Sequence, residues 1–395
     1  MTHLMNTYNR LPVAFTHGKG VRLYDADGRE YLDALAGIAV NGLGHAHPKL
    51  VAALQEQVAR LIHTSNVYRV IEQEQLADRI CELSGMQEVF FGNSGSEANE
   101  GALKLVRMYG HKHGEPQAQT IVMENAWHGR TLATLAATGS EKARKGFEPL
   151  PSGFIRVPYN DLAAVQRAAD ADPRVRAVWI EVLQGEGGIQ VADLEFVRGL
   201  RRMADERGWL LMIDEVQSGI GRTGKWFAHQ WAGVTPDVMT LAKGLGSGVP
   251  IGACVAAGRA AGVFGPGNHG TTFGGGPLAM RAGLETLGII EAEGLMANAV
   301  EQGDRIRAGL KARLGSLPGV RDIRGRGLMI GIELDRPCGE LVKDALGAGL
   351  LINVTRDSVI RLLPPLVVTR ADADLIVERL APLVARFLAA PAKTA

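Results

Sequence analysis

Seven short apolar runs between residues 88 and 257 constrain the fold of this chain more than any other feature of its sequence. Each run is nearly continuous, which is typical of strands buried on both faces of a sheet. Amphipathic stretches at 97–109 and 194–206 lie between runs, and Asp193 is the expected N-cap of the second. Alternating strands and helices predict a largely parallel α/β sheet. The runs are 88–92, 119–124, 154–159, 175–182, 209–215, 237–242 and 253–257.

The character of the sequence changes after about residue 275. The C-terminal elements indicate a smaller α+β unit, so we divide the chain into a large domain (46–275) and a small domain (276–395). We expect residues 1–45 to pack with the small domain. The elements expected there are a long helical stretch (277–315), a strand pair (321–334), short strands at 350–354 and 359–362, and a terminal helix near 372–389.

The composition excludes several classes of partner. Lys and Arg number 43 against 42 Asp and Glu, so neither sign dominates and no footprint for nucleic acid or an anionic membrane is present. No apolar stretch is long enough to span a bilayer, and the N-terminus lacks the apolar run of a signal peptide. The three cysteines have neither disulfide nor zinc spacing, and the histidine pairs lack accompanying ligands. We therefore expect no metal site and a cytoplasmic location.

Polar and glycine-rich residues follow five of the predicted strands. Open parallel sheets bind ligands at the carboxyl ends of their strands, so these five loops predict a single site. Ser94-Gly95-Ser96 precedes a predicted helix, whose N-terminal N–H groups can bind an anion; a simple helix cap is the alternative. The five segments are 93–96, 125–130, 181–188, 214–215 and Lys243.

Two of these side chains carry most of the chemical information. Asp214 ends an apolar run, and a buried carboxylate needs a partner such as a protonated pyridine nitrogen or an ordinary Arg or Lys. Lys243 lies between apolar residues and glycines, where desolvation lowers the pKa of an amine and makes it a nucleophile and base. The alternative is that Lys243 is an ordinary solvated lysine at the end of a strand.

Three larger side chains also suggest ligand contacts. Trp127 can stack on a flat ring, although core packing explains a tryptophan equally well. Arg130 and Arg361 can each bind a carboxylate through two parallel hydrogen bonds, and structural ion pairs are the alternative for both.

Six segments of the chain form longer motifs: NSGSEANE (93–100), WHGR (127–130), QGEGG (184–188), LLMIDEVQSGIGRTG (210–224), LAKGLGSGVPIGA (241–253) and HGTTFGGGPLA (269–279). In these motifs the chain resembles the class III aminotransferases. The resemblance extends from Tyr8 to the terminal helix and implies the type I pyridoxal-phosphate (PLP) fold: a mostly parallel seven-stranded sheet with flanking helices, plus a smaller α+β domain. Ser96 and Gly276 depart from the family, which commonly has Thr and Asn there.

The resemblance implies PLP as the cofactor and assigns residues to it. Lys243 would hold PLP covalently, and Asp214 would pair with its pyridine nitrogen. Thr272 would reach the phosphate bound by a partner subunit, which implies a homodimer with shared active sites. The other cofactor residues implied are Gly95 and Ser96 at the phosphate, Trp127 on the ring, Gln217 at the ring hydroxyl, and Glu215 and Val216 in the same segment.

Within the family, the chain is most similar to members that use N2-acetylornithine. The implied reaction, a step of arginine biosynthesis, moves the δ-amino group to 2-oxoglutarate and yields N-acetylglutamate 5-semialdehyde and glutamate. Arg130 and Thr271 would contact the donor, with Thr271 reaching across the interface. Arg361 would bind the α-carboxylate of glutamate, and Glu186 would neutralise Arg361 when no carboxylate is present. Ile38 stands where relatives that use free ornithine tend to have tyrosine, which favours an acylated donor.

Other functions remain as alternatives. Succinylornithine, ornithine, 4-aminobutyrate and N-succinyl-diaminopimelate are alternative donors. A nucleotide triphosphatase is suggested by GIGRTGK (219–225) after the acidic strand, but Trp226 replaces the Ser or Thr that must ligate magnesium. A regulator built on an aminotransferase domain would need a DNA-binding module, and the motifs begin too early in the sequence to leave room for one.

Overall fold

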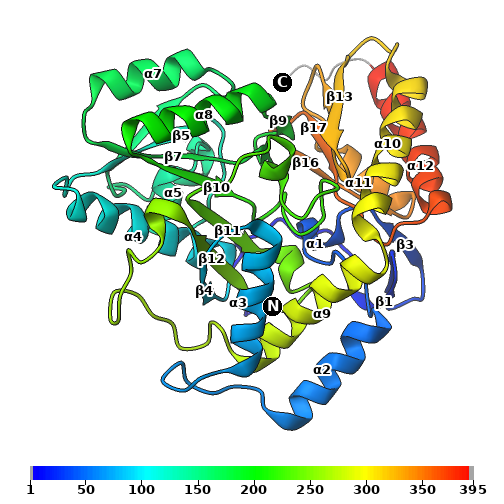
Figure 1. Ribbon diagram of the computed structural model, residues 1–395. Coiled ribbons are helices and arrows are strands. Elements are labelled where there is room, and N and C mark those ends of the chain that lie inside the picture. The colour runs from blue at the N-terminus through cyan, green and yellow to red at the C-terminus, as the bar shows by residue number, and fades with distance from the viewer. Residues whose placement is uncertain (1–2, 391–395) are drawn as a thin grey trace.

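The computed structural model describes residues 3–390, and a seven-stranded sheet forms its centre (Figure 1). The strand order is β4-β12-β11-β10-β7-β5-β6. Only β12 runs antiparallel to its neighbours, so the sheet is mostly parallel, as predicted. Every strand lies within two residues of its predicted bounds. They are β4 (Glu88–Gly92), β5 (Gln119–Met123), β6 (Phe154–Val157), β7 (Val175–Ile180), β10 (Leu210–Asp214), β11 (Val238–Ala242) and β12 (Gly252–Ala256).

Helices cover both faces of this sheet, which explains why its strands are apolar throughout. Leu210 and Met212 of β10 pack into one cluster with α4 (Gly95–Lys112), whereas Leu211 and Ile213 pack into another with α8 (Leu194–Arg207). Asp193 caps α8 as predicted, since its side chain accepts a hydrogen bond from Glu195 N. The other helices before residue 275 are α1 (Ala36–Ala39), α2 (Pro48–Arg60), α3 (Ile71–Ser84), α5 (Leu132–Ala137), α6 (Glu141–Arg144) and α7 (Leu162–Ala171).

The C-terminal part contains a four-stranded sheet of order β13-β14-β17-β16. The predicted continuous helix over 277–315 is in fact two helices, because Gly294 takes a left-handed φ of 63° and redirects the chain. No described helix is long and apolar enough to cross a bilayer. The elements are α9 (Pro277–Ala292), α10 (Leu295–Leu314), β13 (Val320–Arg326), β14 (Met329–Leu334), α11 (Leu341–Gly347), β15 (Leu350–Leu351), β16 (Asn353–Thr355), β17 (Val359–Leu362) and α12 (Arg370–Ala389).

The N-terminal segment contacts this C-terminal part. It forms β1 (Phe15–Lys19), β2 (Arg22–Asp25) and β3 (Glu30–Asp33), and β3 pairs in parallel with β15. Arg22 Nη2 also donates to Asp372 Oδ1 of α12 at 2.7 Å. We therefore propose that residues 1–45 and 276–395 form one unit beside the large domain (46–275). Residues 1–2 and 391–395 of this division lie outside the described residues.

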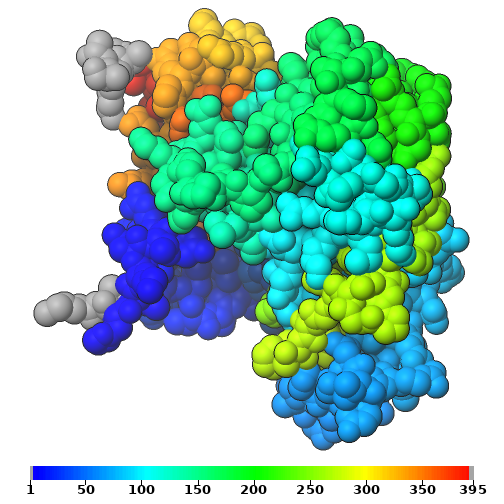
Figure 2. All heavy atoms as spheres, turned by 90° about the vertical axis from the view of Figure 1, so that its left-hand side faces the viewer, coloured from blue at the N-terminus to red at the C-terminus, as the bar shows by residue number. Residues whose placement is uncertain are grey.

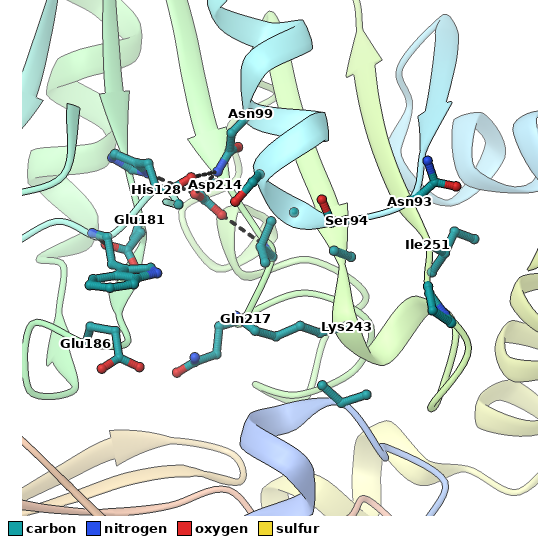
Figure 3. A pocket seen from close by; sticks show the side chains of 18 of the residues that line it. Asn93, Ser94, Asn99, His128, Glu181, Glu186, Asp214, Gln217, Lys243 and Ile251 are labelled. Atoms are coloured by element: carbon teal, nitrogen blue, oxygen red, sulfur yellow. Dashed lines mark hydrogen bonds and ion pairs between the residues drawn. The ribbon is translucent and has the colours of Figure 1, made fainter. Parts of the chain in front are cut away.

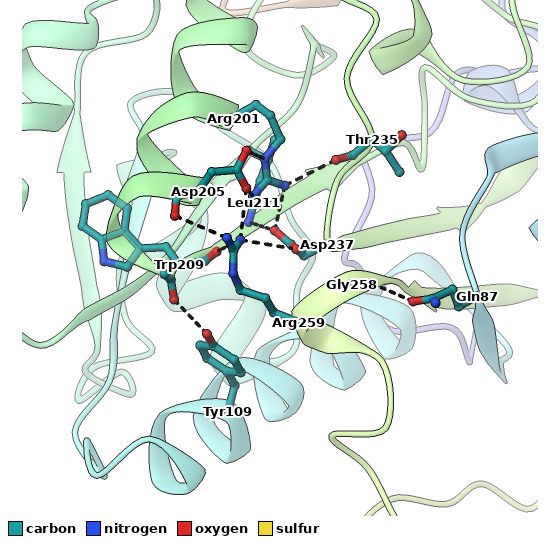
Figure 4. Close-up of polar contacts among 11 residues, drawn as sticks. Gln87, Tyr109, Arg201, Asp205, Trp209, Leu211, Thr235, Asp237, Gly258 and Arg259 are labelled. Atoms are coloured by element: carbon teal, nitrogen blue, oxygen red, sulfur yellow. Dashed lines mark hydrogen bonds and ion pairs between the residues drawn. The ribbon is translucent and has the colours of Figure 1, made fainter.

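An ionic network fixes α8 against the amino ends of β10 and β11 (Figure 4). Asp237 Oδ2 accepts hydrogen bonds from Leu211 N and Arg201 Nη1, both at 2.8 Å. Arg201 also contacts Asp205 at 2.7 Å, and Arg259 contacts Asp205 at 3.2 Å. The network therefore ties together the edge of the sheet opposite to the carboxyl ends of the strands.

We expect Asp237→Ala to lower the free energy of unfolding by about 2–4 kcal/mol, because it leaves Leu211 N and Arg201 without their buried acceptor. The Asp237 side chain is 7% exposed. Asp205→Ala is the matched control: this carboxylate is 54% exposed, and its loss should cost less than about 1 kcal/mol. Chemical denaturation measures both variants. Equal losses would contradict the importance assigned to Asp237.

Candidate active site

A cavity of about 380 Å³ lies at the carboxyl ends of the parallel strands, where the sequence predicts the site (Figure 3). Residues from all five predicted segments line it. The left-handed residues 36–39 lie beside it, and the next residue, Val40, forms part of the wall. The lining residues that matter for its chemistry are Ser96, Trp127, Glu186, Asp214, Gln217 and Lys243.

Asp214 ends β10 and lies at the base of the cavity. Its Oδ2 accepts hydrogen bonds from Asn99 Nδ2 at 2.9 Å and from His128 Nδ1 at 2.8 Å, and its Oδ1 accepts one from Val216 N at 3.0 Å. The His128 ring stacks on Trp179 with the centroids 3.7 Å apart. Because three neutral groups can supply these donors, the carboxylate is fixed in place without an Arg or Lys partner.

Lys243 directly follows β11, the strand next to β10. Its φ is +47°, in the left-handed region that a lysine adopts only when its surroundings hold it there. Burial lowers the pKa of its amine, and the nearby charge of Asp214 opposes this shift. Among the described residues, Nζ has no hydrogen-bond or ion-pair partner. An amine in this setting is available as a nucleophile and base.

The start of α4 faces the same cavity. Ser94 caps the helix by accepting a hydrogen bond from Glu97 N, so the simple capping role is present there. A side chain on Gly95 would come within 2.8 Å of Val216 Cγ1, so this position requires glycine. Ser96 Oγ lies 3.4 Å from Arg130 N. The helix N-terminus and these small residues leave room for an anion.

Arg361 lies behind one wall of the cavity. Its guanidinium is fully buried, and Nη1 contacts Glu186 Oε1 at 2.7 Å and Gln217 Oε1 at 3.3 Å. Nε donates to Asn353 Oδ1 at 3.1 Å, while Nη2 has no partner among the described residues. Glu186 lines the cavity and is 34% exposed, so it covers Arg361 from the solvent side.

Three residues at the site had no role assigned from the sequence, although His128 and Glu181 lie in predicted segments: Asn99, His128 and Glu181. The motifs contain Asn99 and His128, and Glu181 ends a predicted strand, but neither the helical position of Asn99 nor the strand end at Glu181 indicates which groups they bond. Glu181 Oε2 accepts from Trp127 N at 3.0 Å, and Oε1 accepts from Gly185 N at 3.1 Å. Glu181 therefore links the segment of Trp127 to the loop of Glu186.

Some predicted residues do not line the cavity. The Glu215 side chain points elsewhere and binds Ser218 Oγ at 2.6 Å and His229 N at 2.8 Å. The guanidinium of Arg130 lies over the Trp127 ring, 4.9 Å from its centroid, and does not reach into the cavity. Thr271 accepts a hydrogen bond from Gly274 N and lines a different hollow. The adjacent Thr272 is exposed.

The segment that resembles a phosphate-binding loop, 219–225, has a structural role. Arg222 in this loop is buried and donates to the carbonyl oxygens of Leu328 and Pro364. The loop therefore holds the C-terminal part against β10. Burial lowers the pKa of this guanidinium to about 10. Its hydrogen bonds to the two carbonyl oxygens replace the hydrogen bonds to water that burial removes.

Comparison with known proteins matches this arrangement to one family. The family model "Aminotransferase class-III" matches residues 4–384, so the chain belongs to the class III aminotransferases, which are PLP-dependent enzymes. Acetylornithine aminotransferase 1 of Bordetella bronchiseptica is 66% identical to it over 386 residues, which cover 98% of each chain.

Solved structures of other aminotransferases share the fold. The ornithine aminotransferase of Toxoplasma gondii has a TM-score of 0.94 at 32% identity, over 98% of this chain and 93% of that one. The N-acetylornithine aminotransferase of Stenotrophomonas maltophilia has a TM-score of 0.84 at 35% identity, over 97% of this chain and 98% of that one. The predicted type I fold is therefore confirmed, and the backbone alone does not distinguish the two donors.

The residues present fit PLP. A buried carboxylate without an Arg or Lys partner, Asp214, faces the cavity and suits a protonated pyridine nitrogen. A buried amine without a partner, Lys243 Nζ, suits the carbonyl carbon. The N-terminus of α4, where Gly95 and Ser96 line the cavity, suits a phosphate group.

Glu181 provides a test of the charge balance in this site. Burial, and secondarily the charge of Asp214, raises the pKa of its carboxyl to about 8 from an ordinary 4.5. Between these two values the folded protein holds the proton on Glu181 and the unfolded chain does not. The stability that Glu181 contributes is therefore present at low pH and is lost as pH rises through 8. We expect the free energy of unfolding to decline with pH in this range, with a slope that reaches about 1.4 kcal/mol per pH unit.

In the coenzyme-free protein, Glu181→Gln should remove that slope, so that its free energy of unfolding declines less than that of wild type between pH 5 and 8. Denaturation at a series of pH values measures this. Glu206→Gln, on the exposed side of α8, is the control and should keep the wild-type slope. An identical pH dependence in Glu181→Gln and wild type would show that Glu181 is ionised throughout.

Proposed function

We propose that this enzyme transfers the δ-amino group of N2-acetylornithine to 2-oxoglutarate, yielding N-acetylglutamate 5-semialdehyde and glutamate. The observation that carries the proposal is the buried Arg361, covered by a partly exposed Glu186 beside the Lys243 cavity. Relatives that are 57% and 66% identical to this chain are named acetylornithine aminotransferases, which supports the acetylated donor. The reaction belongs to arginine biosynthesis, and we propose the cytoplasm as its location.

The chain's own residues would hold the cofactor as follows. Bound PLP supplies a carbonyl group that condenses with amines and a ring that withdraws electrons from the carbon next to the nitrogen. Asp214 keeps a proton on the ring nitrogen, and Asn99 and His128 keep Asp214 in place. Lys243 holds the carbonyl carbon. The other binding roles that we propose are Gly95 and Ser96 at the phosphate, Trp127 and Val216 at the ring faces, and Gln217 at the ring hydroxyl.

Lys243 would have a second role once the donor amine is bound. Nζ is then a free amine in a buried site, where desolvation disfavours its charged form. It removes a proton from the δ-carbon of the donor and acts as a general acid in the following step. The nearby Asp214 limits how far the pKa falls, so the amine can both accept and return a proton.

Two substrates must use this one cavity, and only one of them presents an α-carboxylate beside the reacting carbon. Glu186 neutralises Arg361 while the δ-amine of the donor reacts. When 2-oxoglutarate enters, its carboxylate replaces Glu186 on the guanidinium, and the unpaired Nη2 provides the second hydrogen bond of a bidentate contact. Gln217 stays on Nη1 in both states and keeps the guanidinium oriented.

The far end of the donor is recognised by less enclosed residues. Arg130, held over the cavity-lining Trp127, would bind a carboxylate or acetamido group at the rim of the cavity. Ile38 is 37% exposed in the left-handed turn beside the cavity and offers no partner for a free α-amino group. An acylated ornithine therefore fits this rim better than free ornithine does.

We propose that the active unit is a homodimer. Residues 66–73 and 271–274 are tied together by hydrogen bonds from Asn66 to the carbonyl oxygens of Thr271 and Gly274. This combined surface exposes several large apolar side chains, which favour burial against another chain. In that dimer Thr272 would reach the phosphate of the partner site, and Thr271 would contact its donor. The exposed side chains are Val67, Tyr68, Ile71 and Phe273.

Steady-state kinetics over a panel of amino donors, with 2-oxoglutarate as acceptor, tests the proposed reaction. We expect kcat/KM for N2-acetylornithine to exceed that for ornithine and 4-aminobutyrate by at least about 100-fold, because a mispaired donor end costs about 3 kcal/mol or more. Succinylornithine and N-succinyl-diaminopimelate complete the panel. Lys243→Ala is the inactive control. A higher kcat/KM for ornithine would reject the acetylated donor but keep the aminotransferase.

Glu186→Ala tests the exchange of partners on Arg361. Removing the carboxylate leaves the guanidinium permanently open to α-carboxylates, so the preference for acetylornithine over glutamate as donor should fall by about tenfold or more, about 1.4 kcal/mol. Stopped-flow rates of the two half-reactions measure this directly. Glu186→Gln keeps the hydrogen bond without the charge, so its donor preference should lie between those of wild type and Glu186→Ala. An unchanged preference in both variants would refute the exchange.

A further inference from the structure

A second large cavity, of about 860 Å³, lies at the edge of the sheet opposite to the active site. The amino ends of β5 and β6 form its floor, together with Arg174, which precedes β7, while α4, α5 and α6 supply its walls. Figure 2 shows the face of the molecule on which α4 and the residues that follow it, cyan to blue-green, reach the surface. No part of the proposed reaction uses this cavity.

Its lining is strongly basic. Four arginines and one histidine line it, and no lining residue is Asp or Glu, although the whole chain has a net charge of only +1. The basic residues are Arg107 and His111 on α4, Arg144 on α6, Arg156 on β6, and Arg174.

Three of these arginines lack a compensating carboxylate. Arg174 is neutralised by Asp172, with Nη2 and Oδ2 2.7 Å apart. In contrast, Arg107, Arg144 and Arg156 form no ion pair with any described residue. Burial lowers the pKa of Arg156, and the nearby positive charge of Arg144 lowers it further, because two like charges repel each other. Like charges held together in this way cost stability unless an anion is bound.

The backbone orients two of the three guanidinium groups. Arg156 Nη2 donates to the carbonyl oxygens of Ala136 and Thr138, and Arg107 Nη2 lies 3.4 Å from Ser152 O. These contacts fix the positions of the groups but do not neutralise their charge. Remaining N–H groups stay available to a ligand, and planar guanidinium groups match the oxygen pairs of phosphate and carboxylate.

We propose that this cavity is a binding site for a small polyanion, a molecule with two or more phosphate or carboxylate groups. Three uncompensated guanidinium groups suit two or more negative charges, and the cavity volume lies within the usual range for small-molecule sites. The site is separate from the PLP cavity, because it lies at the amino rather than the carboxyl ends of the strands. The inference does not depend on the proposed donor.

Isothermal titration calorimetry of the PLP-loaded enzyme with inorganic pyrophosphate, and separately with citrate, tests the site. We expect at least one probe to bind wild type, and the Arg107→Ala/Arg144→Ala double variant to bind it at least about tenfold more weakly. Binding should also weaken as salt is raised. Pyrophosphate binding alone identifies a phosphate ligand, citrate binding alone identifies a polycarboxylate, and either result supports the site.

Controls separate this site from others. Arg60→Ala removes an exposed arginine of α2 outside the cavity and should bind the probe as wild type does. The visible absorbance of bound PLP should stay constant during the titration, since any competition in the active site would change it. If the double variant does not fold, Arg107→Ala alone, at an exposed position, carries the test. No binding of either probe up to about 10 mM, or equal binding by wild type and variant, overturns the proposal.

Discussion

The carboxylate of Asp214 is the group on which the rest of the active site depends. It is buried at the end of β10, and hydrogen bonds from Asn99, His128 and Val216 N fix it there. These partners come from α4, the loop after β5, and the turn that follows β10, so the sheet and its covering helix must both form before the carboxylate is in place. Lys243 follows the adjacent strand, which brings an amine into the same cavity. The fold thus stabilises a charge that the chemistry requires.

The sheet could be predicted almost completely from the sequence, because a strand buried on both faces needs a continuous apolar run. The positions of Asp214 and Lys243 followed from the same reasoning, since each directly follows such a run. The break at Gly294 was missed: helical periodicity continues through 277–315, and only the left-handed φ of a single glycine separates α9 from α10. A glycine is compatible with both a helix and a turn, so the sequence around Gly294 does not show whether the helix continues or ends there.

Side-chain partners were harder to predict than strand ends. Glu215 lies in the predicted cofactor segment, yet its carboxylate turns to Ser218 and His229. Glu181 was known only as a strand-end residue, and its two backbone partners depend on how separate loops fold over it. Similarly, no periodicity shows that Arg107, Arg144 and Arg156 meet in one cavity, because they come from three different elements. Such contacts depend on tertiary packing, which a local pattern does not encode.

The left-handed backbone at Lys243 has a consequence for how this enzyme can evolve or be engineered. A non-glycine residue held at a φ of +47° stores about 1–3 kcal/mol of conformational strain, which the surrounding fold must offset. Glycine would relieve that strain at this position, but it would also remove the amine. Stability and activity therefore make opposite demands on one residue, and selection for thermal resistance alone would lead away from a working enzyme.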